Sequence, residues 1–320
     1  MLTKTEAAQK LLALDDVLIL CHRNPDGDTL GSGFALARAL LNKGRRARVF
    51  CHDAVPEKFA YMVPEMPDFE PKTVISVDVA DFALFGERTE AQIARYGPVA
   101  LAIDHHPSHR PFAEELYLEG DSASCCEIIW GLLKERKDEW QLDAAFASCL
   151  YTGVATDTGC FKFSNTSPRT HRTAAELMEL GADYVSINKV MFDTKTFEDL
   201  KLERLALDRL WMSADGKIAV MTITKELMDE AGVDETGLDA ITALPRKIEG
   251  VEVGITLKQR GESEFKVSVR TGETTSASDI CAHFGGGGHA RAAGCQFEGL
   301  SPEEIREKMV KAAYGEMGRG

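Results

Sequence analysis

A short segment near the N-terminus, HRNPDGDTLGSG (22–33), places one histidine and two aspartates within seven positions and directly follows the apolar run VLIL (17–20). Asp26 and Asp28 are two positions apart on an extended loop, so their carboxylates can point the same way and each can face a different cation. The alternative is a surface turn, because Asn-Pro-Asp-Gly is ordinary turn chemistry and Asp28 or Thr29 could cap a following helix. The segment alone does not decide between these two interpretations.

Ligand-type side chains recur further along the first half of the chain, near other apolar runs. Two neighbouring metal ions need roughly six to eight protein and water ligands, with one carboxylate bridging them. Carboxylates and imidazoles without a thiolate favour Mn²⁺, with Co²⁺ and Fe²⁺ as alternatives, over a structural zinc. Each residue taken separately is a solvated acid or a satisfied histidine, but the whole set predicts metal binding. Its members are His22, Asp26, Asp28, Asp78, His105 and Asp157.

The elements that must position these residues are alternating strands and helices. Short β-branched apolar runs alternate with helical stretches through the first part of the chain. That alternation predicts an α/β fold, with a Rossmann-like parallel sheet wrapped by helices. In open sheets of this kind, ligand sites lie at the carboxyl ends of the strands, so we expect the acids and histidines that follow the runs to converge there. The runs are VLIL (17–20), RVFC (48–51), TVISV (73–77) and VALAI (99–103).

The chain has 320 residues, which is long enough for two domains, since one core usually stops growing near about 250 to 300 residues. We predict a catalytic metal-binding domain over residues 1–193, a helical, charge-rich linker over 194–213 and a smaller α/β domain over 214–320. Three further strand-like runs in the last part predict a mixed sheet. They are KIAVMTIT (217–224), VEVGITL (251–257) and FKVSVR (265–270).

Composition and charge exclude several classes of function. The net charge is −14 and the sequence has no basic stripe interleaved with aromatics, which argues against a protein that tracks long nucleic acid. Small anionic substrates are compatible with this charge if bound cations, an arginine or backbone N–H groups make the potential at the binding site locally positive. The apolar runs are too short for a membrane segment. The eight cysteines contain no CxxC pair and are expected to be reduced, and without a signal-peptide pattern a cytoplasmic location is expected.

The glycine run GGGGHARAAG (285–294) has two interpretations from its residues alone. Glycines let a backbone approach a phosphate closely, and His289 or Arg291 could supply positive charge. Alternatively, the run is a flexible hairpin in which the small residues 292–294 pack tightly. A glycine run without further context favours the hairpin.

Five motifs, in this order and spacing, resemble those of the DHH phosphoesterase family. The layout is similar to the short two-domain branch that carries the DHH-associated C-terminal domain with a GGGH signature, the branch of oligoribonucleases that degrade nanoRNA and of pAp phosphatases. The match spans almost the whole chain. The motifs are HRNPDGDTLGS (22–32), SVDVAD (76–81), IDHHPS (103–108), ATDTGCF (155–161) and GGGGHARAAG (285–294).

The resemblance implies a role for each matching residue. Asp78, Asp104 and His106 would be catalytic: Asp78 bridges two Mn²⁺ ions, His106 contacts the substrate phosphate and Asp104 supports the histidine pair. Mg²⁺ or Co²⁺ are alternatives to Mn²⁺. One ion would be held by His22, Asp26 and Asp78, and the other by Asp28, Asp78, His105 and Asp157. The second domain would bind the substrate across an interdomain cleft through Ser268, Arg270, Gly286, Gly287, Gly288 and His289.

The activity implied is that of a Mn²⁺-dependent phosphodiesterase and exonuclease that hydrolyses short oligonucleotides (nanoRNA) to mononucleotides and also dephosphorylates 3′-phosphoadenosine 5′-phosphate (pAp). A phosphodiesterase for cyclic di-AMP or its linear product pApA shares the same motifs and is the main alternative. A non-catalytic nucleotide-binding regulatory module would lack ligand residues, and none is missing. The expected partners are a short oligonucleotide or small nucleotide, no long nucleic acid and no membrane, with a homodimer left open.

Overall fold

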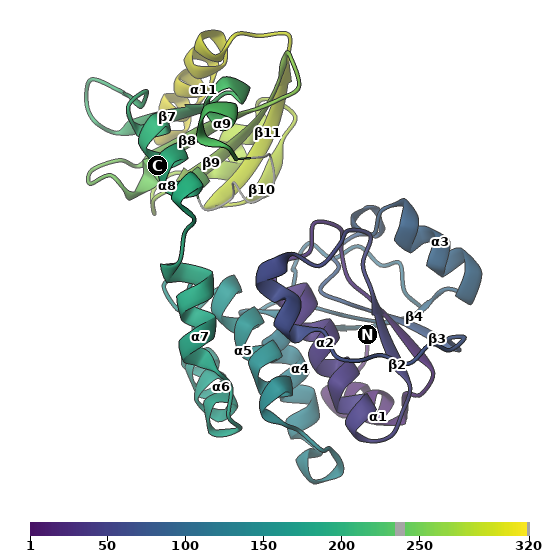
Figure 1. Cartoon of the computed structure of the whole chain (residues 1–320). Coiled ribbons are helices and arrows are strands. Elements are labelled where there is room, and N and C mark those ends of the chain that lie inside the picture. Colours follow the sequence, from purple (N-terminus) through teal and green to yellow (C-terminus); the bar gives the residue numbers. More distant parts are fainter. Residues whose placement is uncertain (234–240, 319–320) are drawn as a thin grey trace. The chain divides into compact units, whose positions relative to one another are not determined.

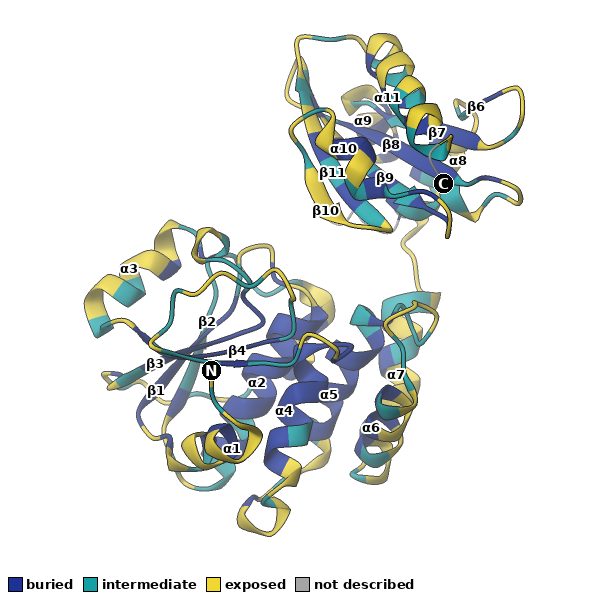
Figure 2. Cartoon of the chain, turned by 180° about the vertical axis from the view of Figure 1, so that it is seen from behind, coloured by how far each residue is buried: buried dark blue, intermediate teal, exposed yellow. Residues whose placement is uncertain are grey.

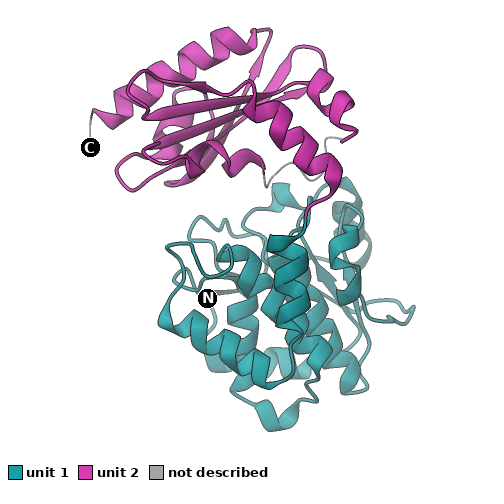
Figure 3. Cartoon of the chain, turned by 60° about the vertical axis from the view of Figure 1, so that its left-hand side comes forward, with its two compact units in different colours: residues 1–194 teal, residues 195–320 magenta. Residues whose placement is uncertain are grey.

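The chain consists of two compact units, with the boundary between Thr194 and Lys195 (Figure 3). The structure is a computed structural model that describes residues 1–233 and 241–318. The boundary between the units lies at the start of segment 194–213, and the separate role of that segment as a linker stays a prediction. Each unit contains its own sheet, as the α/β prediction with a second, mixed sheet requires.

The first unit is built on a five-stranded sheet in the order β2-β1-β3-β4-β5, with every neighbouring pair parallel. Strands β2, β3 and β4 of this sheet are labelled in Figure 1. The four apolar runs of the sequence form β1 to β4, which confirms the predicted parallel sheet. β1 is buried at all of its positions, as expected for a central parallel strand covered on both faces. The strands are β1 (Val17–Leu20), β2 (Ala47–Phe50), β3 (Thr73–Val77), β4 (Val99–Asp104) and β5 (Glu115–Leu118).

Helices α2, α4 and α5 form the most deeply buried helical layer of this unit and are largely dark blue in Figure 2. Two glycines allow them to pack closely. A Cβ atom on Gly31 of α2 would lie 2.5 Å from the Cys149 carbonyl oxygen, and one on Gly153 of α5 would overlap the Cys126 sulfur. The helices are α1 (Lys4–Ala13), α2 (Gly27–Asn42), α3 (Glu87–Tyr96), α4 (Cys125–Lys134), α5 (Ala144–Asp157), α6 (Pro168–Glu179) and α7 (Tyr184–Asn188).

The second unit contains a six-stranded mixed sheet in the order β10-β11-β9-β8-β7-β6, in which only the pair β7 and β8 is parallel. Its strands are β6 (Trp211–Met212), β7 (Ile218–Ile223), β8 (Val253–Arg260), β9 (Glu264–Thr271), β10 (Gly287–His289) and β11 (Ala292–Glu298). Its helices are α8 (Phe197–Leu207), α9 (Lys225–Ala231), α10 (Ala277–Ala282) and α11 (Pro302–Met317). Across both units, none of the described helices has the length and apolar character needed to span a bilayer.

The glycine contact between α5 and α4 generates a stability prediction. We expect Gly153→Ala to destabilise the first unit by about 1–3 kcal/mol, because the added methyl group would lie 2.9 Å from Cys126 Cβ and 2.8 Å from Asp28 Oδ1 in a packed interior. Gly131→Ala on α4 is the matched control: its nearest neighbours are 3.8 Å away, so the helix propensity of alanine should be neutral or stabilising by up to about 1 kcal/mol. Urea denaturation of both variants measures the difference, and equal stabilities would contradict the packing argument.

Candidate functional site

The carboxyl ends of three parallel strands bring the predicted ligands of the first unit together. His22 follows β1 by two residues, Asp78 follows β3 directly, and Asp104 is the last residue of β4. Asp78 has a φ of 58°, a left-handed backbone conformation that aspartate tolerates better than most residues. Its N–H donates to the Ile103 carbonyl at 2.9 Å, so the neighbouring strand holds this turn in place.

The first ligand group consists of His22, Asp26 and Asp78, whose ligand atoms all lie within 4.8 Å of one another. His22 Nε2 is 3.7 Å from Asp26 Oδ1 and 3.6 Å from Asp78 Oδ2. The other ring nitrogen, Nδ1, is 2.8 Å from the Arg23 carbonyl oxygen. Because a carbonyl can only accept, Nδ1 carries a hydrogen, which leaves Nε2 as the ring nitrogen that faces the acids and that a metal ion could bind.

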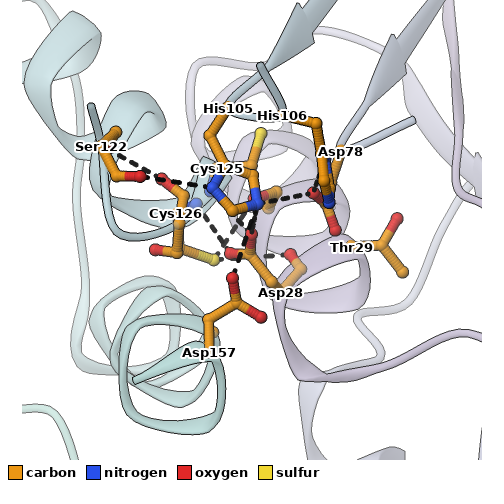
Figure 4. A network of polar contacts seen from close by, with 12 residues as sticks. Asp28, Thr29, Asp78, His105, His106, Ser122, Cys125, Cys126 and Asp157 are labelled. Carbon is orange, nitrogen blue, oxygen red and sulfur yellow. Dashed lines mark hydrogen bonds and ion pairs between the residues drawn. The ribbon is translucent and has the colours of Figure 1, made fainter. Parts of the chain in front are cut away.

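The second ligand group consists of Asp28, His105 and Asp157, again within 4.8 Å (Figure 4). His105 Nε2 is 3.5 Å from Asp157 Oδ2 and 3.4 Å from Asp78 Oδ1. His105 Nδ1 faces the Ser122 carbonyl at 3.3 Å, so Nε2 of this ring also faces the acids. Asp78 therefore presents Oδ2 to one histidine and Oδ1 to the other, which is the arrangement that a bridging carboxylate requires.

The charges of the site fit a pair of cations. Burial, together with the charge of Asp78, raises the pKa of Asp28 to about 7. Burial and the neighbouring carboxylates also raise the pKa of Asp157 well above its ordinary value. Asp78 Oδ1 is buried without a hydrogen-bond partner among the described residues. Bound cations would stabilise the ionised carboxylates and give this oxygen a partner, so the residues present fit a two-metal centre.

The same excess of negative charge raises the pKa values of the two histidines. Burial alone would lower the pKa of His22, but Asp26 and Asp78 raise it to about 11. Likewise, burial opposes but does not prevent an increase in the pKa of His105 to about 10, caused first by Asp78. Without a metal, the protons on these rings supply the positive charge that the carboxylates need; a cation would replace them.

Backbone amides at the start of two helices hold the acids of the first motif. Asp28 accepts from the first two amides of α4, the N–H groups of Cys125 and Cys126, at 2.6 and 2.8 Å. Asp26 caps α2 and accepts from the N–H groups of Asp28 and Thr29 at 3.0 and 3.1 Å. The suggestion that Asp28 or Thr29 caps this helix is therefore wrong, because only Asp26 has the extended backbone of an N-cap.

Asp104 is fully buried and lies behind the histidine pair. It accepts from the His105 N–H at 2.8 Å and from His106 Nδ1 at 2.8 Å. His106 Nδ1 is also 3.6 Å from Asp78 Oδ1. A third histidine, His109, contacts the same carboxylate at 2.6 Å. The sequence interpretation missed it, although three histidines within five positions were a visible signal.

In the second unit, three of the predicted substrate-binding residues, Ser268, Arg270 and His289, share one face of the sheet. Arg270 of β9 is paired with Ala292 of β11, which is paired with His289 of β10. In the row beside it, Ser268 is paired with Gly294. Paired residues of antiparallel strands point to the same side, so only small residues separate Arg270 from His289. The alternate residues of β9 and β11 are buried in the core of this unit.

Two of the predicted glycines are required by the close approach of β10 to β11. A Cβ on Gly286 would overlap the Gly294 carbonyl oxygen, and one on Gly288, with its φ of 147°, would lie 2.7 Å from the Ala292 oxygen. Gly287 has no neighbour within 4 Å of such a Cβ. The guanidinium of Arg291 donates to the Thr275 carbonyl at 2.8 Å, so this arginine links the hairpin turn to the loop between β9 and α10.

Comparisons with known proteins give one family match in each of the two units. The DHH family, N-terminal domain, matches residues 16–154, and the DHHA1 domain matches residues 215–317. A Thermus thermophilus protein named "Bifunctional oligoribonuclease and PAP phosphatase NrnA" is 29% identical over 95% of this chain and 90% of its own length. The "Cyclic-di-AMP phosphodiesterase GdpP" of Geobacillus thermodenitrificans is 22% identical over 97% of this chain but only 49% of its own length.

A solved structure has the same fold as this chain. It is the crystal structure of an exopolyphosphatase-related protein from Bacteroides fragilis, with a TM-score of 0.87 at 22% identity, and the match covers 98% of this chain and 96% of that one.

The shared position of Asp78 generates a metal-binding prediction. With Mn²⁺ as the probe, calorimetry should detect two ions on the wild-type chain, whereas Asp78→Ala should weaken binding at both groups by at least about tenfold. Asp26→Ala should weaken one group only, because Asp26 belongs to a single ligand group. Asp68→Ala removes the same charge at a side chain that is 99% exposed and should bind like wild type. Two tightly bound ions on Asp78→Ala would contradict the bridging assignment.

Proposed function

The chain is a DHH-family protein whose second unit is a DHHA1 domain, and from this premise we propose that it is a Mn²⁺-dependent phosphohydrolase that degrades very short oligonucleotides to mononucleotides and dephosphorylates pAp. The observation that carries this proposal is the carboxylate of Asp78, which faces one histidine of each ligand group. The name of the Thermus thermophilus relative, which is similar over 95% of this chain, supports the same substrates.

The mechanism we propose gives each residue of the first unit a defined task. A pair of divalent cations, when bound, supplies a water molecule acidic enough to attack phosphorus near neutral pH and offsets charge on the phosphoryl oxygens. His22, Asp26 and Asp78 would hold one cation, and Asp28, Asp78, His105 and Asp157 the other. Asp104 accepts the Nδ1 hydrogen of His106. That bond orients the ring of His106, and its Nε2 is the atom that we assign to a phosphoryl oxygen of the substrate.

The second unit would supply recognition. Arg270 and His289 lie on one face of the sheet with Ala292 between them. An arginine binds a phosphate through two parallel hydrogen bonds, and the small side chains beside it leave room for a nucleotide. We propose that this face binds the phosphate that is not cleaved. A cytoplasmic location fits the eight free thiols, since reduced cysteines persist there. A homodimer is compatible with the proposal.

One alternative substrate class has specific support. The Geobacillus thermodenitrificans relative is named as a cyclic-di-AMP phosphodiesterase and matches 97% of this chain. This chain spans only about half of that protein, 49% of its length, whereas it spans 90% of the oligoribonuclease relative. We therefore place short oligonucleotides and pAp first and cyclic di-AMP or pApA second.

A substrate panel with Mn²⁺ tests the proposed function. We expect kcat/KM for pAp and for a 5′-phosphorylated dinucleotide to exceed that for cyclic di-AMP and for pyrophosphate by at least about tenfold, a difference of about 1.4 kcal/mol in transition-state stabilisation. A five-mer and pApA complete the panel. A preference for cyclic di-AMP or pApA would support the alternative phosphodiesterase. No hydrolysis of any member would indicate a nucleotide-binding module instead.

Removal of the positive charge on the second unit should weaken recognition without affecting the metals. We expect Arg270→Ala to lower kcat/KM on pAp and on a 5′-phosphorylated dinucleotide by at least about tenfold, because charge-assisted phosphate contacts contribute on the order of 1.5–3 kcal/mol. His289→Ala should act in the same direction. Arg270→Lys should restore activity only in part, since lysine cannot make the paired contact.

Two controls accompany these variants. Arg260→Ala removes an equal charge from an exposed position at the end of β8 and should leave kcat/KM unchanged. A simple aryl phosphodiester has no second phosphate to hold, so Arg270→Ala should hydrolyse it at the wild-type rate with unchanged Mn²⁺ stoichiometry. Equal losses on the aryl ester and on pAp would argue against a role in phosphate recognition.

A further inference from the structure

His109 is a buried histidine beside the active-site segment that the proposed mechanism does not use. Its side chain is only 1% exposed, and its Nδ1 lies 2.6 Å from Asp104 Oδ2. The other oxygen of this carboxylate accepts the backbone N–H groups of His105 and His106 at 2.8 and 3.3 Å, so Asp104 acts as an acceptor in this network. The hydrogen of His109 is therefore on Nδ1, and it points at Asp104.

The two oxygens of Asp104 have different partners. Oδ1 accepts from the N–H groups of His105 and His106, at 2.8 and 3.3 Å, and from His106 Nδ1 at 2.8 Å. Oδ2 accepts from His109 Nδ1, and the hydrogen bonds found among residues 1–233 and 241–318 include no other donor to Oδ2. Because a buried carboxylate oxygen without a donor is unfavourable, the orientation of Asp104 depends on His109.

The other ring nitrogen of His109 shows why an imidazole at this position needs an explanation. Nε2 is buried and has no hydrogen-bond partner among the described residues. The ring lies against Phe112, with the centroids 5.3 Å apart, and Phe112 packs in turn on Phe82 and Phe85. An unpaired buried nitrogen costs on the order of 1–3 kcal/mol, and an apolar side chain could fill the same place without that cost. The Nδ1 hydrogen is the feature that an apolar residue would not provide.

A carboxylate held at one oxygen only can rotate about its Cβ–Cγ bond, since this torsion has a broad energy profile. A second donor on the other oxygen fixes the plane of the group. In Asp104 the fixed plane aims Oδ1 at His106 Nδ1 and thereby sets the direction of that ring. The chain of contacts runs from His109 through Asp104 to His106, which lies 3.6 Å from the carboxylate of Asp78.

We propose that His109 is a positioning residue that fixes the carboxylate of Asp104 and, through it, the ring of His106. The chain of hydrogen bonds stands on the structure, and the consequence for turnover rests on the proposed function, in which His106 contacts a phosphoryl oxygen. A side chain that donates from the position of Nδ1 should replace His109, and one that cannot donate from there should not.

Three substitutions separate positioning from packing. Asparagine places its amide nitrogen close to the position of Nδ1, glutamine carries the same amide one bond too far, and leucine fills the space without a donor. With Mn²⁺ and pAp, we expect His109→Leu and His109→Gln to lower kcat by about 10- to 100-fold with KM changed by less than about threefold, the range typical for lost outer hydrogen-bond partners. His109→Asn should stay within about threefold of wild type.

A measurement on the metal-free, full-length protein tests the contact itself. In histidine-labelled protein, the NMR signal of the His106 Nδ1 hydrogen should move upfield in His109→Leu and His109→Gln and stay near its wild-type position in His109→Asn. This readout needs neither substrate nor metal, so it remains decisive if the chain hydrolyses no member of the substrate panel. If the leucine variant does not fold, the asparagine and glutamine pair gives the same comparison.

Two results would overturn the proposal. An unchanged His106 signal in the leucine and glutamine variants would show that His109 does not orient the ring. Equal losses of kcat in the asparagine and leucine variants would assign His109 to packing against Phe112 instead of to positioning.

Discussion

Repulsion between carboxylates is the constraint on which the first unit is built. Asp78 and Asp28 are both buried, and their mutual repulsion adds to burial in raising the pKa of Asp28. Two groups of partners compensate this negative charge before any cation binds. The N-terminal amides of α4 donate to Asp28, where the positive end of a helix favours a negative charge. The histidines 22 and 105 then face the shared carboxylate of Asp78.

Close packing is what keeps these like charges together. Asp157 lies at the end of α5, and Gly153 lies one turn earlier on the same helix, where any side chain would meet Asp28 and Cys126. Gly31 has the equivalent role on α2 against the backbone of α5. Small residues therefore determine how near the fourth acid comes to the others. In this way the helical core contributes directly to the site, although none of its glycines can bind a metal.

The sequence predicts the parallel sheet and its ligand-bearing ends because both follow from short local patterns. Apolar runs mark β1 to β4, and the acids and histidines follow them directly. Other features depend on partners far away along the chain. The amides of Cys125 and Cys126 bind an aspartate 97 and 98 positions earlier, and a backbone N–H has no signature in a sequence. β5 was not predicted, since ELYL (115–118) alternates in character and is only partly buried at an edge. The spacing of His109 marks it as a candidate, but its contact with the second oxygen of Asp104 becomes visible only in the structure.

The acidity of the chain and the proposed substrate size are connected by charge. A net charge of −14 repels a polyanion, so each phosphate that binds needs its own local compensation. In the proposed function, cations held at Asp78 would compensate one phosphate, and Arg270 and His289 on the face of β9, β10 and β11 would compensate another. The proposal therefore favours a substrate with two phosphates, such as pAp or a 5′-phosphorylated dinucleotide. Each further nucleotide would add a phosphate without adding a cation to meet it. The proposed function therefore predicts a limit on substrate length that is set by charge as well as by the space available to the bases.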